Sequence, residues 1–293
     1  MSTRRSPVRR AVIPAAGFGT RFLPVTRSVP KVLLPVLARP LIHYAVAEAA
    51  AAGIEEIALV LSPGSEAVAA YFDEQPELER ALEARGDTRL LSQQRAISAM
   101  TDVSVVVQHE ARGLGHAVFT ARDFIRHEPF AVLLPDDVIW SEAPAIGQLI
   151  DVHDRLGGSV VAAKEVPDEA VEALGIIDGE PVSDRVRAVR ALVEKPRLAD
   201  APSNLAIIGR YVLTPAVLEH LARGRTGAGG EIQLTDAIAA TIGTEPVHAC
   251  AFAGEHVDAG TPAGMLAAVL REAREDPALR ARVLEIVRGW ERG

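Results

Sequence analysis

Residues 15–21, Ala-Ala-Gly-Phe-Gly-Thr-Arg, combine a flexible backbone with side chains that can bind phosphate. Gly17 and Gly19 permit positive φ and a close approach to a ligand, so successive amide N–H groups can surround phosphate oxygens. Thr20 adds a hydroxyl, and Arg21 adds a planar guanidinium. The segment lacks the third glycine of the dinucleotide fingerprint and the Gly-Lys-Ser/Thr of the Walker loop. It predicts a phosphate-binding turn, with a tight turn that binds nothing as the alternative.

Lys31 adds a second cation to this region of the chain. It lies between Pro30 and the apolar residues 32–36. A buried ammonium group without a partner is costly, so a lysine in such a run needs a reason. We expect Lys31 to face a charged group of the protein or of a ligand.

Adjacent carboxylates follow the apolar residues 131–134, a sequence of the length of a buried strand. Asp136 and Asp137 would then lie at the carboxyl end of that strand, where open α/β sheets place their ligands. Magnesium prefers a few carboxylates together with phosphate oxygens, so the pair predicts a metal site. A strand-ending turn is the alternative.

Other polar residues occupy comparable positions. Gln108 follows residues 103–107, a largely apolar run of the length of a buried parallel strand. It offers one acceptor and two donors, as the edge of a pyrimidine base requires. Glu194 and Lys195 place an acceptor beside a cation, which suits a sugar phosphate. The alternatives are a solvated strand end for Gln108 and a surface ion pair for Glu194 and Lys195.

These residues need a scaffold, and the pattern of the chain predicts an α/β fold. Short apolar runs alternate with helical patterns, which is typical of a mainly parallel sheet wrapped by helices. The expected strands are residues 11–15, 57–61, 103–107, 131–134, 160–163, 186–193, 206–212 and 247–252. The expected helices are residues 40–52, 115–124, 215–222, 232–242, 262–274 and 277–290.

The length and composition of the chain favour one domain over residues 1–293. We expect a flexible basic tail at 1–9 and a C-terminal helix within 277–293 that packs or forms an oligomer contact. A net charge of −8 argues against nucleic acid. We find no apolar run long enough to span a membrane and no signal peptide. The single cysteine, Cys250, fits a reducing cytoplasm and a buried strand.

The motifs taken in order resemble the sugar nucleotidyltransferases, and within them they are most similar to the bacterial UTP–glucose-1-phosphate uridylyltransferases. The resemblance begins with residues 15–35 and covers nearly the whole chain. It continues through Gln108 with Gly-Leu-Gly-His-Ala at 113–117, Leu-Pro-Asp-Asp at 134–137, Val-Glu-Lys-Pro at 193–196, Gly-Arg-Tyr-Val-Leu at 209–213 and Gly-Ala-Gly-Gly-Glu-Ile-Gln-Leu-Thr-Asp at 227–236. It implies a Rossmann-like, mainly parallel mixed sheet, cytoplasmic localisation, and a homodimer or homotetramer.

The resemblance also implies a reaction, in which glucose 1-phosphate attacks the α-phosphorus of UTP and expels pyrophosphate with the help of Mg²⁺. It assigns catalysis to Arg21, Lys31, Asp136 and Lys195, and metal binding to Asp136 and Asp258. It assigns the nucleotide to Ala15, Ala16, Gly17, Gly19, Thr20, Gln108 and Gly113, and the sugar to Gly175, Glu194 and Lys195. It leaves His116 and His256 structural, since neutral imidazole is no natural magnesium ligand.

Three residues depart from the pattern of this family: Val32 replaces the usual Glu, Leu174 the usual Tyr, and Ala259 the more common Cys. They leave open a nucleotidyltransferase that uses dTTP or another sugar 1-phosphate, such as N-acetylglucosamine 1-phosphate. A non-catalytic nucleotide-sugar sensor is the alternative outside the enzymes. A sensor does not need Arg21, Lys31, Asp136 and Asp258 together. This chain keeps all four, which favours an enzyme.

Overall fold

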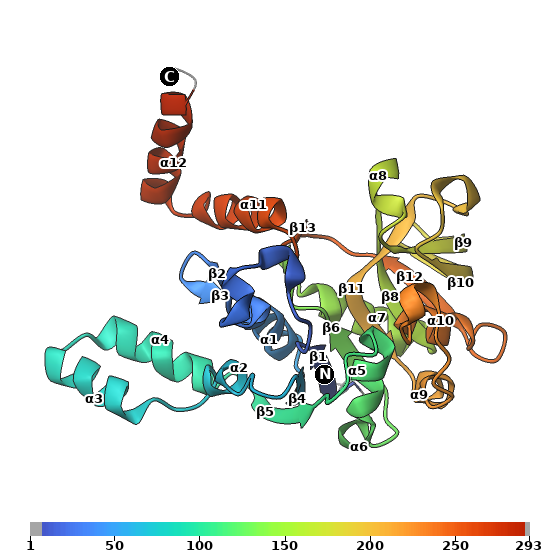
Figure 1. The fold of residues 1–293 in the computed structure, drawn as a ribbon, viewed down its shortest axis with the longest axis horizontal. Coiled ribbons are helices and arrows are strands. Elements are labelled where there is room, and N and C mark those ends of the chain that lie inside the picture. Colours follow the sequence, from blue (N-terminus) through green and yellow to red (C-terminus); the bar gives the residue numbers. More distant parts are fainter. Residues whose placement is uncertain (1–7, 291–293) are drawn as a thin grey trace.

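The computed structural model describes residues 8–290, and a nine-stranded sheet forms its centre (Figure 1). The strands are β1 (Arg10–Pro14), β4 (Glu56–Leu61), β5 (Asp102–Val107), β6 (Phe130–Leu133), β8 (Ser159–Glu165), β9 (Gly175–Ser183), β10 (Val186–Glu194), β11 (Leu205–Leu213) and β12 (Val247–Ala251). Their order across the sheet is β5-β4-β1-β6-β11-β8-β12-β10-β9. The α/β fold is confirmed.

The first half of the sheet is parallel, because β1 pairs in parallel with β4 and β6, and β4 with β5. The apolar runs of β1, β4 and β6 are buried, as predicted for parallel strands covered on both faces. The prediction that residues 103–107 are buried is wrong. β5 is the edge strand, and Val105 and Val107 remain 46% and 40% exposed.

The second half continues the same sheet with mixed strand directions. β11 runs antiparallel to β6 and β8, β12 runs parallel to β8, and β10 runs antiparallel to β12 and β9. One sheet therefore passes through both halves of the chain, and residues of the predicted site lie at or just beyond the ends of strands from each half.

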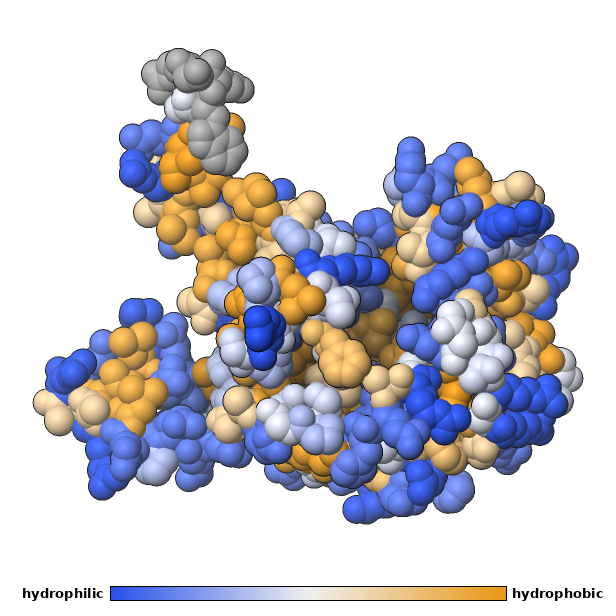
Figure 2. All heavy atoms as spheres, viewed as in Figure 1, coloured by the Kyte–Doolittle hydropathy of each residue, from blue (hydrophilic) through white to orange (hydrophobic). Residues whose placement is uncertain are grey.

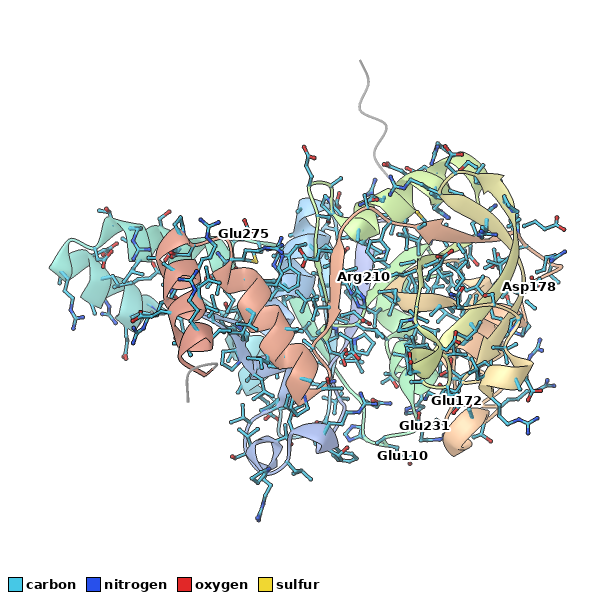
Figure 3. All side chains as sticks on the ribbon, turned by 90° about the horizontal axis from the view of Figure 1, so that it is seen from above. Glu110, Glu172, Asp178, Arg210, Glu231 and Glu275 are labelled. Carbon is cyan, nitrogen blue, oxygen red and sulfur yellow. The ribbon has the colours of Figure 1, made fainter. Side chains whose placement is uncertain are left out.

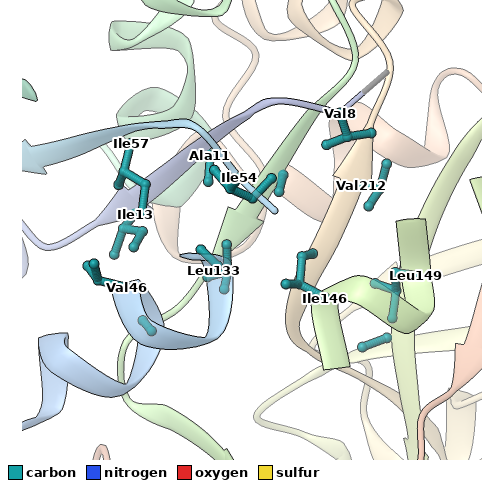
Figure 4. Packing of buried hydrophobic residues seen from close by; sticks show 14 of the residues in the cluster. Val8, Ala11, Ile13, Val46, Ile54, Ile57, Leu133, Ile146, Leu149 and Val212 are labelled. Carbon is teal, nitrogen blue, oxygen red and sulfur yellow. The ribbon is translucent and has the colours of Figure 1, made fainter. Parts of the chain in front are cut away.

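Helices cover both faces of the sheet. They include α1 (Leu41–Ala51), α5 (Leu114–Thr120), α6 (Arg122–Ile125), α7 (Ala145–Leu156), α9 (Ala216–Leu221) and α10 (Leu234–Ala239). Alternate residues of β1 face opposite sides: Ala11 and Ile13 pack with α1 and α7 (Figure 4), whereas Val12 packs with α5 and α10. The single helix predicted for 115–124 is two short helices, α5 and α6, with a break at Ala121.

Two pairs of helices project from the body (Figure 1). After the short α2 (Ala67–Ala70), one pair is α3 (Pro76–Arg85) and α4 (Thr88–Ser98); the other is α11 (Pro262–Ala273) and α12 (Pro277–Trp290). The described residues also form α8 (Asp168–Val171), several short 3-10 helices and two small sheets. One joins β2 (Pro35–Val36) to β3 (Arg39–Pro40), and the other joins β7 (Asp137–Trp140) to β13 (Glu255–Asp258).

The described chain begins inside the core. Val8 is buried beside Ile54 and Val212, and the carbonyl of Arg9 accepts hydrogen bonds from the backbone of residues 55 and 56. The guanidinium of Arg10 pairs with Glu56 and Glu128. Residues 8 and 9 therefore belong to the fold, and residues 1–7 of the predicted tail lie outside the described residues. Between residues 8 and 290, no helix is long and apolar enough to cross a membrane.

Candidate active site

The predicted phosphate turn and the predicted metal site lie at neighbouring strand ends, because β1 and β6 are parallel and adjacent. The turn leaves β1 through Ala15, whose amide donates to the carbonyl of Val60 at 2.8 Å. Ala16 is half-buried, and Gly17, Thr20 and Arg21 are exposed. This exposed backbone can contact a ligand at the end of the sheet.

The two glycines of the turn differ in conformation. Gly19 has φ +61°, and a Cβ there would lie 2.8 Å from the Cβ of Lys31, so a side chain would strain the backbone and displace the lysine. Gly17 has no such φ and no atom within 4 Å of an added Cβ. Gly19 therefore brings the turn against Lys31.

Lys31 has a charged partner, as its apolar neighbours in the sequence predicted. Its Nζ donates to Oδ2 of Asp136 at 2.7 Å, and the two side chains are 20% and 26% exposed. The pair joins the segment after the turn to the loop after β6. A cation beside a carboxylate, both partly open to solvent, is an arrangement that a charged ligand can reach.

Asp136 and Asp258 converge on one point. A Cβ added to Gly260 would lie 2.8 Å from Oδ2 of Asp136 and 2.8 Å from Oδ1 of Asp258. Burial and the charges of Asp137 and Asp136 raise the pKa of Asp258, while Arg21 and the amide of Gly260 act against this rise. Two carboxylate oxygens that point toward one position can bind a cation between them.

The donor set fits magnesium. Within residues 8–290, no group of three or more His, Cys, Asp or Glu side chains is arranged to hold a metal ion. The protein thus offers two carboxylates, Asp136 and Asp258, and the other ligands must be water or substrate oxygens. Magnesium is commonly bound through one or two carboxylates plus substrate phosphates.

The predicted base side of the site is built around Gln108. The residue is buried, and its Nε2 lies 2.8 Å from Nδ1 of His116 and 3.5 Å from the carbonyl oxygen of Gly113. Gly113 has φ +99°, and a Cβ there would lie 2.7 Å from the Cβ of Glu231. Gln108 and Gly113 therefore lie together, with His116 fixing the orientation of the amide.

The predicted sugar side lies at the start of β9 and the end of β10, where Gly175 pairs with Glu194. A Cβ on Gly175 would lie 3.0 Å from Oγ1 of Thr235 and 3.1 Å from Oε2 of Glu194. The Nζ of Lys195 lies 3.6 Å from Oε1 of Glu194. The three predicted residues are therefore brought together. Thr235 was missed, although it lies in the motif at 227–236.

The phosphate and sugar sides are close enough to share an electrostatic environment. Tyr211 is buried on β11, and burial together with the charges of Asp137, Glu194 and Asp136 raises its pKa. The surface is hollowed between the β9–β10 part and the N-terminal part of the molecule (Figure 2). The arrangement can hold a nucleotide on one side and a phosphorylated sugar on the other.

The model of a protein family described as nucleotidyl transferase matches residues 10–275, which include every residue assigned above to the site. The chain belongs to this family. Among its relatives, the UTP–glucose-1-phosphate uridylyltransferase of Staphylococcus haemolyticus is 44% identical over 281 residues, covering 96% of this chain and 98% of that protein. The enzyme of the same name from Bacillus subtilis is also 44% identical, over 282 residues.

Solved structures agree with this placement. A UDP-glucose pyrophosphorylase complexed with UDP-glucose is 38% identical, with a TM-score of 0.84, and covers 92% of this chain and 99% of that one. The UTP-bound enzyme from Acinetobacter baumannii is 36% identical, with a TM-score of 0.86 and coverage of 96% and 98%. The family membership and the mixed, Rossmann-like sheet are confirmed.

The three departures from the family pattern lie behind the site. Val32 and Ala259 are 3% and 0% exposed, and Leu174 is half-buried against Val171 and Ile176. The amide of Ala259 donates to the carbonyl of Asp136 at 2.8 Å. Two of the three departures are therefore buried and the third is half-buried, and Ala259 contacts the loop of Asp136 through its backbone.

Proposed function

We propose that this protein transfers the uridylyl group of UTP to glucose 1-phosphate, giving UDP-glucose and pyrophosphate. The observation that carries the proposal is the match of nearly the whole chain to uridylyltransferases, two of which hold UTP or UDP-glucose in solved structures. The pairing of Lys31 with Asp136 beside the glycine turn supports it, because nucleotidyl transfer depends on charge neutralisation around phosphates.

The reaction forms a bond between the sugar-phosphate oxygen and the α-phosphorus of UTP, and breaks the bond from that phosphorus to the bridging oxygen of pyrophosphate. It needs no covalent intermediate and no strong protein base. Lys31 and Arg21 stabilise the negative charge that moves onto pyrophosphate. Magnesium, held by Asp136 and Asp258, would supply further neutralisation of the reacting phosphates.

The remaining residues bind and orient the substrates. Gln108 contacts the uracil with the help of the backbone of Ala16 and Gly113. The rest of the turn, at Ala15, Gly17, Gly19 and Thr20, binds the nucleotide through its backbone. Glu194 accepts hydrogen bonds from hexose hydroxyls, Gly175 lets the backbone approach the sugar, and Lys195 binds the phosphate of glucose 1-phosphate.

The test is a panel of nucleoside triphosphates against sugar 1-phosphates, with pyrophosphate release measured for each pair. UTP with glucose 1-phosphate should give the highest kcat/KM. A preference for dTTP or N-acetylglucosamine 1-phosphate would change the assigned substrates, but the proposed reaction type, nucleotidyl transfer, would stand. Tight binding of UDP-glucose with no turnover of any pair would favour the sensor.

We further propose that the chain folds as one domain, is located in the cytoplasm and forms a homodimer or homotetramer. The sheet that spans both halves supports the single domain, and the buried free thiol of Cys250 fits a reducing compartment. Apolar residues gather along α11 and α12 (Figure 2), including Leu266, Leu270 and Leu284, which are 41–55% exposed. Light scattering should therefore give a mass above one chain, and Leu284→Asp should lower it.

A further inference from the structure

Asp137 is adjacent to a proposed metal ligand, yet its carboxylate is bonded to the protein on both oxygens. Oδ1 lies 2.6 Å from Nε2 of His256, and Oδ2 accepts from the amide of Gly209 at 3.1 Å. Both carboxylate oxygens of Asp137 are therefore engaged by donors of the protein.

These contacts connect the elements that carry the metal-binding residues. Asp137 begins β7 directly after Asp136, and His256 lies on β13 two residues before Asp258. In the pairing of β7 with β13, Asp137 lies opposite Asp258. The imidazole of His256, on the same strand as Asp258, contacts the carboxylate of Asp137. The geometry of Asp136 relative to Asp258 therefore depends on this contact.

The third element is β11. A side chain on Gly209 would collide with Oδ2 of Asp137 and with Leu134, so only glycine lets the strand come this close. The next residue, Arg210, donates to the carbonyls of Leu134 and Asp137, on either side of the loop that carries Asp136. The carboxylate of Asp137 thus joins β7, β13 and β11 at the base of this loop.

We propose that Asp137 is a positioning residue and not a metal ligand: bonded to His256 and Gly209, it sets the spacing of Asp136 and Asp258 that lets them share one divalent cation. This inference rests on the proposed function for its metal site. It predicts that His256, whose imidazole contacts Asp137 and is not proposed as a metal ligand, controls metal affinity.

The test measures binding of Mn²⁺ to the full-length protein by electron paramagnetic resonance, together with thermal unfolding. His256→Leu fills a similar volume without a donor and should weaken Mn²⁺ binding roughly tenfold to a hundredfold, as loss of a group that orients ligands commonly does. His256→Gln can still donate from a similar position and should bind Mn²⁺ nearly as wild type does. Rescue by Gln separates positioning from mere loss of packing.

A matched control is His153→Leu. His153 is also a buried imidazole with a short hydrogen bond, 2.6 Å to the carbonyl of Gly158, but it lies on α7 away from the site. This variant should unfold at a lower temperature and keep wild-type Mn²⁺ affinity. If it weakened Mn²⁺ binding as much as His256→Leu, general loss of stability would explain both, and the inference would be wrong.

Asp137→Asn decides between the two roles of the carboxylate. The amide can accept from Gly209 and donate to the imidazole, so the positioning role predicts a smaller loss of Mn²⁺ affinity than in Asp136→Asn. An equal loss in a folded protein would make Asp137 a ligand and overturn the inference. Wild-type affinity in His256→Leu would overturn it as well. Failure of the wild-type protein itself to bind Mn²⁺ would instead remove the metal site of the proposed function, and the inference with it.

Discussion

The ammonium of Lys31 donates to Oδ2 of Asp136 at 2.7 Å, so a cation of the protein already contacts an oxygen proposed to hold a metal. In the proposed reaction, Lys31 exchanges this carboxylate for phosphate oxygens when nucleotide and metal bind. The proposal therefore predicts that Lys31 competes with the metal in the free protein and assists it in the substrate complex.

This exchange makes Lys31→Ala informative. Removing the competing ammonium should leave the Mn²⁺ affinity of the free protein unchanged or increase it. The activation free energy should rise by about 3–4 kcal/mol, so that the single-turnover rate falls roughly a hundredfold to a thousandfold. Lys31→Arg should not restore the rate, because a planar fork does not replace a compact charge. The rate and the Mn²⁺ affinity are measured on the same preparations. A normal rate would limit Lys31 to supporting the fold.

Lys195→Ala tests the division of the site into two sides. Lys195 lies with Glu194 and Gly175, so its loss should raise KM for glucose 1-phosphate and leave KM for UTP nearly unchanged. Arg197→Ala is the control, since this arginine is 82% exposed and pairs with Asp200 on the surface. Steady-state kinetics with each substrate varied in turn give the answer. A rise confined to UTP would show that the sides are assigned wrongly.

The buried pair of Arg210 and Glu48 should dominate stability near the site. Their side chains are 1% and 8% exposed and meet at 2.8 Å, and Arg210 lies near the middle of the molecule (Figure 3). Glu48→Ala leaves a buried guanidinium without its anion and should lower the free energy of unfolding by about 3–5 kcal/mol.

Glu180→Ala provides the comparison for this pair. It removes a surface partner of Arg190 and should cost at most about 1 kcal/mol. Urea unfolding of both variants measures the difference. Equal losses would mean that the Arg210–Glu48 pair contributes no more than a surface ion pair.

Local sequence predicted the parts of the fold in which pattern and burial agree. β1, β4 and β6 are short apolar runs, and they form buried parallel strands. β5 has the same apolar character, but its place at the sheet edge depends on which strands pair, and local pattern carries no such information.

For the site as well, local sequence indicated which residues need partners but not which residues those partners are. The apolar surroundings of Lys31 indicated that it needs a partner, but the partner lies 105 residues away. The contact of Asp137 with His256 spans 119 residues, so sequence gave Asp137 only a possible metal role. Glu48 had one signal, a single acid in an alanine-rich helix that is otherwise mostly apolar. These long-range pairs form only when the sheet brings its strand ends together.

The most direct measurement follows UDP-glucose and pyrophosphate formed from UTP and glucose 1-phosphate by the wild-type protein and by Asp136→Asn, with Mg²⁺ and with excess chelator. The account predicts equal amounts of both products from the wild-type protein with Mg²⁺, none with chelator, and at most a small fraction of that rate from a folded Asp136→Asn protein. Undiminished product formation in chelator or by Asp136→Asn would contradict it.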